Sequence, residues 1–135
     1  MLVKDFLQET DKKFYIRPHV VCADGFRLSI QAGPGLYCHA KDGYVGTGDH
    51  INCLAGDIPY SGEWDSVEVG LDSAQEQYSE KDQQRLGSKG CDEVDNLLVF
   101  LFVPLGDVEK ECLAHGGIVK IDYDGRSVPV GVYDV

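Results

Sequence analysis

The stretch Cys22-Ala-Asp-Gly-Phe-Arg-Leu-Ser-Ile-Gln-Ala-Gly-Pro-Gly-Leu-Tyr-Cys38 combines a turn signal, an alternating segment and a glycine-proline loop. Asp24-Gly25 supplies the positive φ that a tight hairpin turn requires. Apolar and polar residues then alternate from Phe26 to Ala32, which is the pattern of a β-strand. We therefore predict an antiparallel hairpin at this point, and this hairpin determines the fold class.

The two faces of the second strand differ in chemistry. One face is apolar and is expected to join the core; it consists of Phe26, Leu28, Ile30 and Ala32. The other face offers hydrogen-bonding groups instead of a row of lysine and glutamate. We treat that face as a candidate ligand- or partner-binding surface, formed by Arg27, Ser29 and Gln31.

The residues before the hairpin predict one helix and one strand. Apolar residues within 3–13 have the spacing of a short amphipathic helix. Residues 14–22 are rich in β-branched and aromatic side chains, which favours a strand. Pro18 cannot donate a backbone hydrogen bond, so an edge position or a bulge is expected there.

The residues after the hairpin complete the predicted sheet. Residues 64–71 form a further strand, and 96–103 form an apolar strand that we expect to be covered on both faces. A helix at about 104–115 should pack on this sheet and end at Gly116-Gly117. Residues 118–133 predict a final hairpin.

These elements predict a single α+β domain over residues 1–135. The domain should contain a mostly antiparallel sheet, two short helices and a long glycine-rich loop at 33–63. Residues 72–95 contain seven acidic and three basic residues, and we expect an exposed acidic insertion that is helical in part.

The charge balance restricts the partners. The chain of 135 residues has a net charge of -11, which repels phosphate backbones and argues against direct binding of nucleic acid. The longest apolar run, 97–105, is far shorter than the roughly 20 residues that span a bilayer, so no membrane span is expected. An acidic surface attracts basic partners and also keeps a protein soluble. The N-terminus lacks an apolar signal core, and we expect a cytoplasmic protein.

Cysteine and histidine residues provide the candidate metal ligands. Cys38 and His39 precede His50 and Cys53, and these side chains are suitable for tetrahedral zinc. The five cysteines are better suited to free thiols than to a disulfide scaffold. Cys38, Cys53 or Cys112 is also a candidate nucleophile, with His39, His50 or His115 as its base, although no sequence signature marks any of the three.

Aromatic residues are dense in the first half of the chain. Tyrosine and tryptophan combine apolar area with one polar group, and they are common at binding surfaces. We predict a contact surface that includes Tyr37, Tyr44, Tyr60 and Trp64. The glycine-rich segments nearby lack a P-loop lysine, but their backbone amides are suited to a small anionic ligand.

Several motifs together resemble a family of small proteins encoded by bacteriophages and prophages. The resemblance lies in the pattern VCADGFxxSIQA at 21–32, Tyr37-Cys38, VEVG at 67–70, Val103-Pro104 and HGGI at 115–118. The insertion at 72–95 and the segment after Ile118 are longer than in that pattern. The family has no established catalytic activity, so the resemblance implies no catalytic residue.

The resemblance implies a phage protein that acts in the host cytoplasm. The first hypothesis is a non-enzymatic, anti-CRISPR-like inhibitor that binds a host defence protein or sequesters a small nucleotide signal. The second is a small zinc- or thiol-dependent enzyme, and the third is a structural or regulatory accessory protein. Because the strand at 97–103 is very apolar, homo-oligomerisation is also a prediction.

Overall fold

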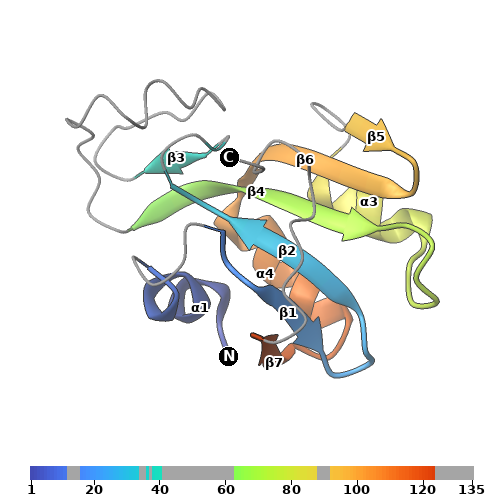
Figure 1. Ribbon diagram of the computed structural model, residues 1–135, viewed down its shortest axis with the longest axis horizontal. Helices are drawn as coiled ribbons and strands as arrows, with labels where there is room; N and C mark the ends of the chain where they lie inside the picture. The colour runs from blue at the N-terminus through green and yellow to red at the C-terminus, as the bar shows by residue number, and fades with distance from the viewer. Residues whose placement is uncertain (12–15, 34–35, 37, 41–62, 88–91, 124–135) are drawn as a thin grey trace.

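The fold was analysed in a computed structural model that describes residues 1–11, 16–33, 36, 38–40, 63–87 and 92–123. Three helices and seven strands are described in these ranges (Figure 1). In chain order they are α1 (Val3–Glu9), β1 (His19–Cys22), β2 (Arg27–Gln31), β3 (His39–Ala40), β4 (Trp64–Asp72), α3 (Glu80–Leu86), β5 (Asp92–Val94), β6 (Leu97–Pro104), α4 (Leu105–Ala114) and β7 (Ile118–Asp122).

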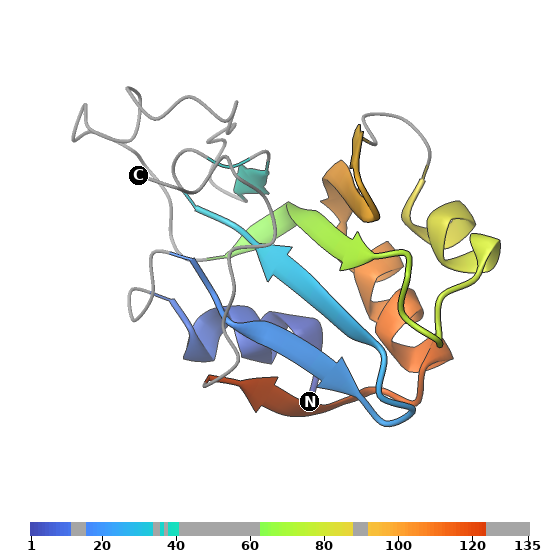
Figure 2. The ribbon, with the colours of Figure 1, turned by 45° about the vertical axis from the view of Figure 1, so that its right-hand side comes forward.

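The described strands form one antiparallel sheet. Its order is β5-β6-β4-β2-β1-β7, and β3 pairs with β4 beside this path. Helices α1 and α4 lie on the same side of the sheet, and α3 packs against the outer side of α4 (Figures 1 and 2). The predicted α+β class with a mostly antiparallel sheet is therefore confirmed.

The Asp-Gly turn forms the predicted hairpin between β1 and β2. Val20 pairs with Leu28, and Val21 pairs with Arg27. Gly25 has a φ of 92°, which is the conformation for which glycine was expected. The carboxylate of Asp24 accepts a hydrogen bond from the Phe26 N–H at 2.9 Å, so the side chain stabilises its own turn.

The core lies between the sheet and the two helices α1 and α4. Cross-strand pairs such as Ile30 with Val69 and Val69 with Phe100 align apolar side chains on the face that the helices cover. Val108 and Cys112 of α4 and Phe6 of α1 are fully buried against it. The predicted packing of the second helix on the sheet is confirmed.

Strand β6 confirms the expectation that both of its faces are covered only in its first half. The consecutive residues Leu98, Val99 and Phe100 are all buried, whereas Leu101 and Phe102 are half-buried. The β4–β6 register shifts between Val67 and Val69, and Phe102 has a φ of 53° at this bulge. A bulge bends the strand and rotates its side chains, which explains the partial exposure.

Two segments differ from their predicted boundaries, because helix α1 ends at Glu9 and β1 begins only at His19. The first strand of the predicted final hairpin is present as β7, which pairs with β1. The second half of the predicted final hairpin lies outside the described residues. Within 72–95, the third helix α3 buries Asp82 and Leu86, whereas most other described side chains of that segment are exposed or half-buried.

Candidate functional site

The polar face of β2 serves mainly to connect parts of the fold. The side chain of Gln31 accepts a hydrogen bond from the Arg17 N–H at 2.8 Å and donates to the Arg17 carbonyl at 2.8 Å. It also donates to Ser29 Oγ at 2.9 Å, and both Ser29 and Gln31 are buried. Arg27 is exposed and forms an ion pair with Asp122 of β7 at 2.7 Å. Of these three candidates, only Arg27 is accessible to a partner.

The predicted aromatic surface can be examined only at Trp64. This residue begins β4 and is buried, with 2% of its surface exposed. Tyr37, Tyr44 and Tyr60 lie outside the described residues. The contact surface therefore remains a prediction, and Trp64 belongs to the core in this structure.

Adjacent candidate zinc ligands point in different directions. Cys38 is buried next to Gly33, with 3.5 Å between its sulfur and the Gly33 N, whereas His39 is exposed. The His39 ring lies 2.9 Å from Ser66 Oγ, measured from Nδ1. His50 and Cys53 lie outside the described residues, so the predicted zinc site remains untested. Because their side chains point apart, Cys38 and His39 do not converge on one metal position.

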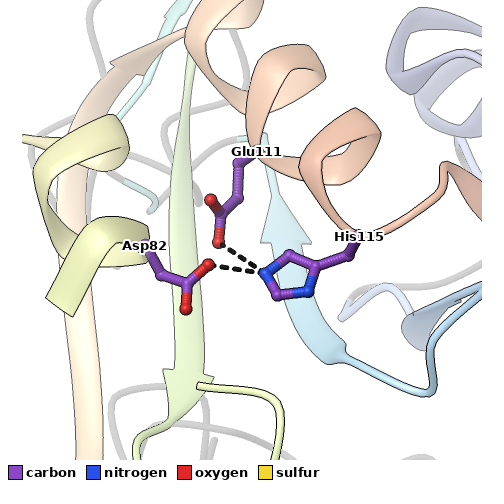
Figure 3. Close-up of side chains that lie close together, drawn as sticks. All are labelled: Asp82, Glu111 and His115. Carbon is purple, nitrogen blue, oxygen red and sulfur yellow. Dashed lines mark hydrogen bonds and ion pairs between the residues drawn. The ribbon is translucent and has the colours of Figure 1, made fainter. Parts of the chain in front are cut away.

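A different group of side chains gathers where α3, α4 and the β1–β2 turn meet. We call it the carboxylate–histidine cluster, and it consists of Asp24, Asp82, Arg85, Glu111 and His115. Asp82 and Glu111 are completely buried, and 7% of His115 is exposed. Figure 3 shows the side chains of Asp82, Glu111 and His115 converging from α3 and the C-terminal end of α4.

His115 is at the centre of this cluster. Its Nδ1 lies 2.6 Å from Asp24 Oδ2, and its Nε2 lies 2.5 Å from Asp82 Oδ1. The ring stacks on Phe26 with 3.8 Å between centroids and 5° between planes. Two carboxylates and one aromatic ring therefore determine the orientation of the imidazole.

Arg85 links the two buried carboxylates. Its Nε donates to Glu111 Oε1 at 2.6 Å, and a terminal nitrogen donates to Asp82 Oδ1 at 2.7 Å. The second oxygen of Asp82 accepts a hydrogen bond from the Ser79 N–H at 2.7 Å. Glu111 Oε2 is buried and accepts no hydrogen bond from the residues that the structure describes, and it lies 3.8 Å from His115 Nε2.

The close spacing shifts the pKa values in opposite directions. Burial, and after it the neighbouring Asp82 carboxyl, raises the pKa of Glu111 to about 7. Burial opposes ionisation of Asp82, but contacts with Glu111, His115 and the Ser79 N–H outweigh it and hold the pKa of Asp82 below its ordinary value. Burial also opposes the charged form of His115, yet Asp82 and Asp24 raise its pKa.

Local sequence features place each member of the cluster. Ser79 and Asp82 form a capping box at the start of α3, which turns the Asp82 side chain inward. Glu111 and His115 are four residues apart and lie on one face of α4. The helix ends at Ala114, and Gly116 and Gly117 follow with φ values of 91° and 86°, so the predicted glycine stop after the helix is confirmed.

Sequence reasoning did not identify this cluster. The S-x-x-D capping signal at Ser79 and the i, i+4 pair of Glu111 and His115 were the available signals. Neither signal indicates that α3 packs on α4 or that the hairpin turn brings Asp24 to the same place. The meeting of three distant segments is a property of the tertiary structure.

Two thiols lie in the same region of the core. Cys22 and Cys112 are buried and lie close enough for their thiols to influence each other. The neighbouring thiol lowers the pKa of Cys22, whereas it raises the pKa of Cys112 together with burial. Cys112, a candidate nucleophile from the sequence, is therefore held in its neutral form.

Comparisons with models of known protein families, with curated proteins and with solved structures find no match for this chain. Among the described residues, no helix combines the length and the apolar character that crossing a membrane would need.

Proposed function

We propose that this chain is a phage-encoded, non-enzymatic inhibitor of a host anti-phage defence system, in the manner of an anti-CRISPR protein. The sequence resemblance supports the phage origin and a place of action in the host cytoplasm. The proposed mechanism is direct binding of a defence protein through an acidic surface. The observation that carries the proposal is a group of exposed acids at one end of the sheet.

This acidic end is formed by the β1–β2 turn and the segment that leads from β4 into α3. Gln75 exchanges hydrogen bonds with the Arg27 backbone at 2.8 and 3.0 Å, and Gln77 donates to the Asp24 carbonyl at 3.1 Å. These contacts hold the two segments side by side. We define the acidic end by its exposed carboxylates: Asp24, Asp72, Glu76 and Glu80.

The charge of this surface favours a basic protein partner over a nucleotide. Clustered carboxylates repel phosphate groups and attract lysine- and arginine-rich surfaces, which raises the association rate with such a partner. Defence proteins that bind nucleic acid offer surfaces of this kind. Sequestration of a small nucleotide would have to use the glycine-rich loop at 33–63, most of which lies outside the described residues.

Affinity purification from infected host cells, followed by mass spectrometry of proteins and small molecules, tests the proposal. The Glu76→Gln/Glu80→Gln variant should lose the captured partner, and raised salt should weaken the wild-type complex. The matched control, Asp5→Asn/Glu9→Gln, removes the same charge from exposed positions on α1 and should retain it.

Three outcomes would contradict the proposal. Equal loss of the partner in both variants would show that total charge, and not the acidic end, governs capture. Purification of a nucleotide without a protein would favour the sequestration hypothesis. A reaction product that depends on zinc or on a thiol would favour the alternative enzyme hypothesis.

A further inference from the structure

The carboxylate–histidine cluster has the arrangement of a metal site. One ligand atom from each of Asp82, Glu111 and His115 lies within 4.8 Å of the other two. All three side chains are buried, and Figure 3 shows them pointing toward one common position. We propose that Asp82, Glu111 and His115 bind one divalent transition-metal ion, Zn²⁺ in the first instance.

Each proposed ligand is oriented by a contact made through its other polar atom. His115 uses Nδ1 for Asp24, which leaves Nε2 directed toward the cluster. Glu111 uses Oε1 for Arg85, and Asp82 uses Oδ2 for the Ser79 N–H, while Asp82 Oδ1 also accepts a hydrogen bond from Arg85 at 2.7 Å. Metal-binding histidines and carboxylates are commonly held by outer partners of this kind.

Glu111 Oε2 provides the second, independent observation. Glu111 is completely buried, and this oxygen accepts no hydrogen bond within the described part of the chain. In the metal-free protein this oxygen is where Glu111 holds its proton against Asp82, and a cation would replace that proton. A cation between Oε2 and His115 Nε2, now 3.8 Å apart, would provide its partner.

The distances require only small adjustments. Ligand atoms about 2.0 Å from a tetrahedral ion lie about 3.3 Å from one another. The contacts of His115 Nε2 are 2.5 Å to Asp82 and 3.8 Å to Glu111, so they bracket this spacing. The geometry would be complete if the Glu111 carboxylate moved closer to His115 Nε2 and the Asp82 carboxylate moved farther from it.

The donor set selects the type of metal. Two carboxylates and one imidazole suit zinc or manganese, whereas calcium and magnesium prefer oxygen ligands alone and copper(I) prefers thiolates. Two carboxylates neutralise the divalent charge, and the nearby charges of Arg85 and Asp24 balance each other. Three protein ligands also leave one coordination position for water or another ligand. This inference does not rest on the proposed inhibitor function.

Cobalt substitution tests the site in the full chain. Protein treated with a chelator is titrated with Co²⁺ and followed by absorption spectroscopy, and Zn²⁺ is then titrated by calorimetry. We expect one equivalent to bind, with visible cobalt bands and without a thiolate-to-metal charge-transfer band. A charge-transfer band would overturn the proposal, because it would place the metal on cysteines such as Cys38 and Cys53.

Substitutions of single residues test which side chains bind the metal. Glu111→Gln should abolish binding of one equivalent of Zn²⁺, and Asp24→Asn should weaken it by about 10- to 100-fold as an outer partner. Glu80→Gln on α3 and the double variant Cys38→Ser/Cys53→Ser should bind as the wild type does. Circular dichroism checks that each variant is folded. If Glu111→Gln does not fold, the cobalt spectrum of the wild-type protein decides the outcome. Absence of binding, or binding that persists in folded Glu111→Gln, would overturn the proposal.

Discussion

Two buried polar clusters occupy different parts of this molecule, and they differ in how completely their atoms are paired. The first lies beside α1, where Arg17 donates to the carbonyls of Leu7 and Ala32 and to the hydroxyl of Thr10. The second is the carboxylate–histidine cluster, in which Glu111 Oε2 accepts no hydrogen bond from any described residue.

The difference separates a structural role from a candidate site. Each of the three side-chain nitrogens of Arg17 has an acceptor, and its backbone pairs with Gln31. A buried network that is paired in this way holds its segments in one arrangement. In the second cluster, three ligand atoms converge on a point where one oxygen accepts no hydrogen bond from the described residues. The Arg17 cluster therefore explains stability, and the carboxylate–histidine cluster is the better candidate for binding.

The largest predicted effect comes from breaking the paired cluster. Arg17→Ala leaves two carbonyls and the Thr10 hydroxyl without their donor, so the free energy of unfolding should fall by about 3 to 5 kcal/mol. Urea denaturation followed by circular dichroism measures this change.

Arg27→Ala is the matched control for Arg17→Ala. Arg27 also forms an ion pair, but 43% of its side chain is exposed. Exposed pairs contribute at most about 1 kcal/mol. Similar losses in the two variants would mean that burial does not distinguish them, and the structural role assigned to Arg17 would be wrong.

The second prediction concerns the pH dependence of the metal-free protein. Because the pKa of Glu111 is raised to about 7, folded Glu111 binds its proton more tightly than the unfolded chain does. Between about pH 5.5 and 8, stability should therefore fall as pH rises through 7, by about 2 kcal/mol. The raised pKa of His115 adds a loss in the same direction.

The other charged neighbours do not reverse this trend. The pKa values of Asp24 and Asp82 are lowered, so both stay ionised in the folded and unfolded chain over this pH range. Arg85 remains charged throughout. Glu111→Gln should flatten the profile, measured by denaturation in the presence of a chelator. An unchanged slope in this variant would show that Glu111 is not the titrating group.

The fold could be predicted to a greater extent than the site. The Asp-Gly turn, the alternation in β2 and the paired glycines after α4 are local signals, and each specifies its element without reference to the rest of the chain. The burial of Ser29 and Gln31 was not predictable, because it depends on Arg17 and on the packing of the preceding segment. The alternation of apolar and polar residues distinguishes the two faces of a strand, but it does not show which residues cover the polar face.

The site depended on contacts between distant residues. Asp24 and His115 are 91 positions apart, and Asp82 reaches both only because α3 packs on α4. Single-sequence patterns describe neighbours along a helix or strand. They contain no information on this convergence, and for that reason the sequence directed attention to cysteines instead.

The smallest predicted effect concerns the approach of α4 to the β1–β2 turn, which brings His115 to Asp24. Gly116 and Gly117 both have positive φ, so alanine at either position is strained by about 1 kcal/mol or more. A Cβ at Gly116 would also lie 2.6 Å from Ala23 Cβ, whereas one at Gly117 would meet no atom within 4 Å. Gly116→Ala should therefore destabilise the protein by roughly 1 kcal/mol more than Gly117→Ala does.

The same pair of variants also tests how the turn positions Asp24. The added methyl group at Gly116 pushes Ala23, and with it Asp24, away from the His115 ring, which should weaken Zn²⁺ binding relative to Gly117→Ala. Thermal melts and zinc titrations of the two variants measure the two differences. Equal zinc affinities despite unequal stabilities would show that contact with Asp24 does not orient His115, and the outer partner assigned to the histidine would be wrong.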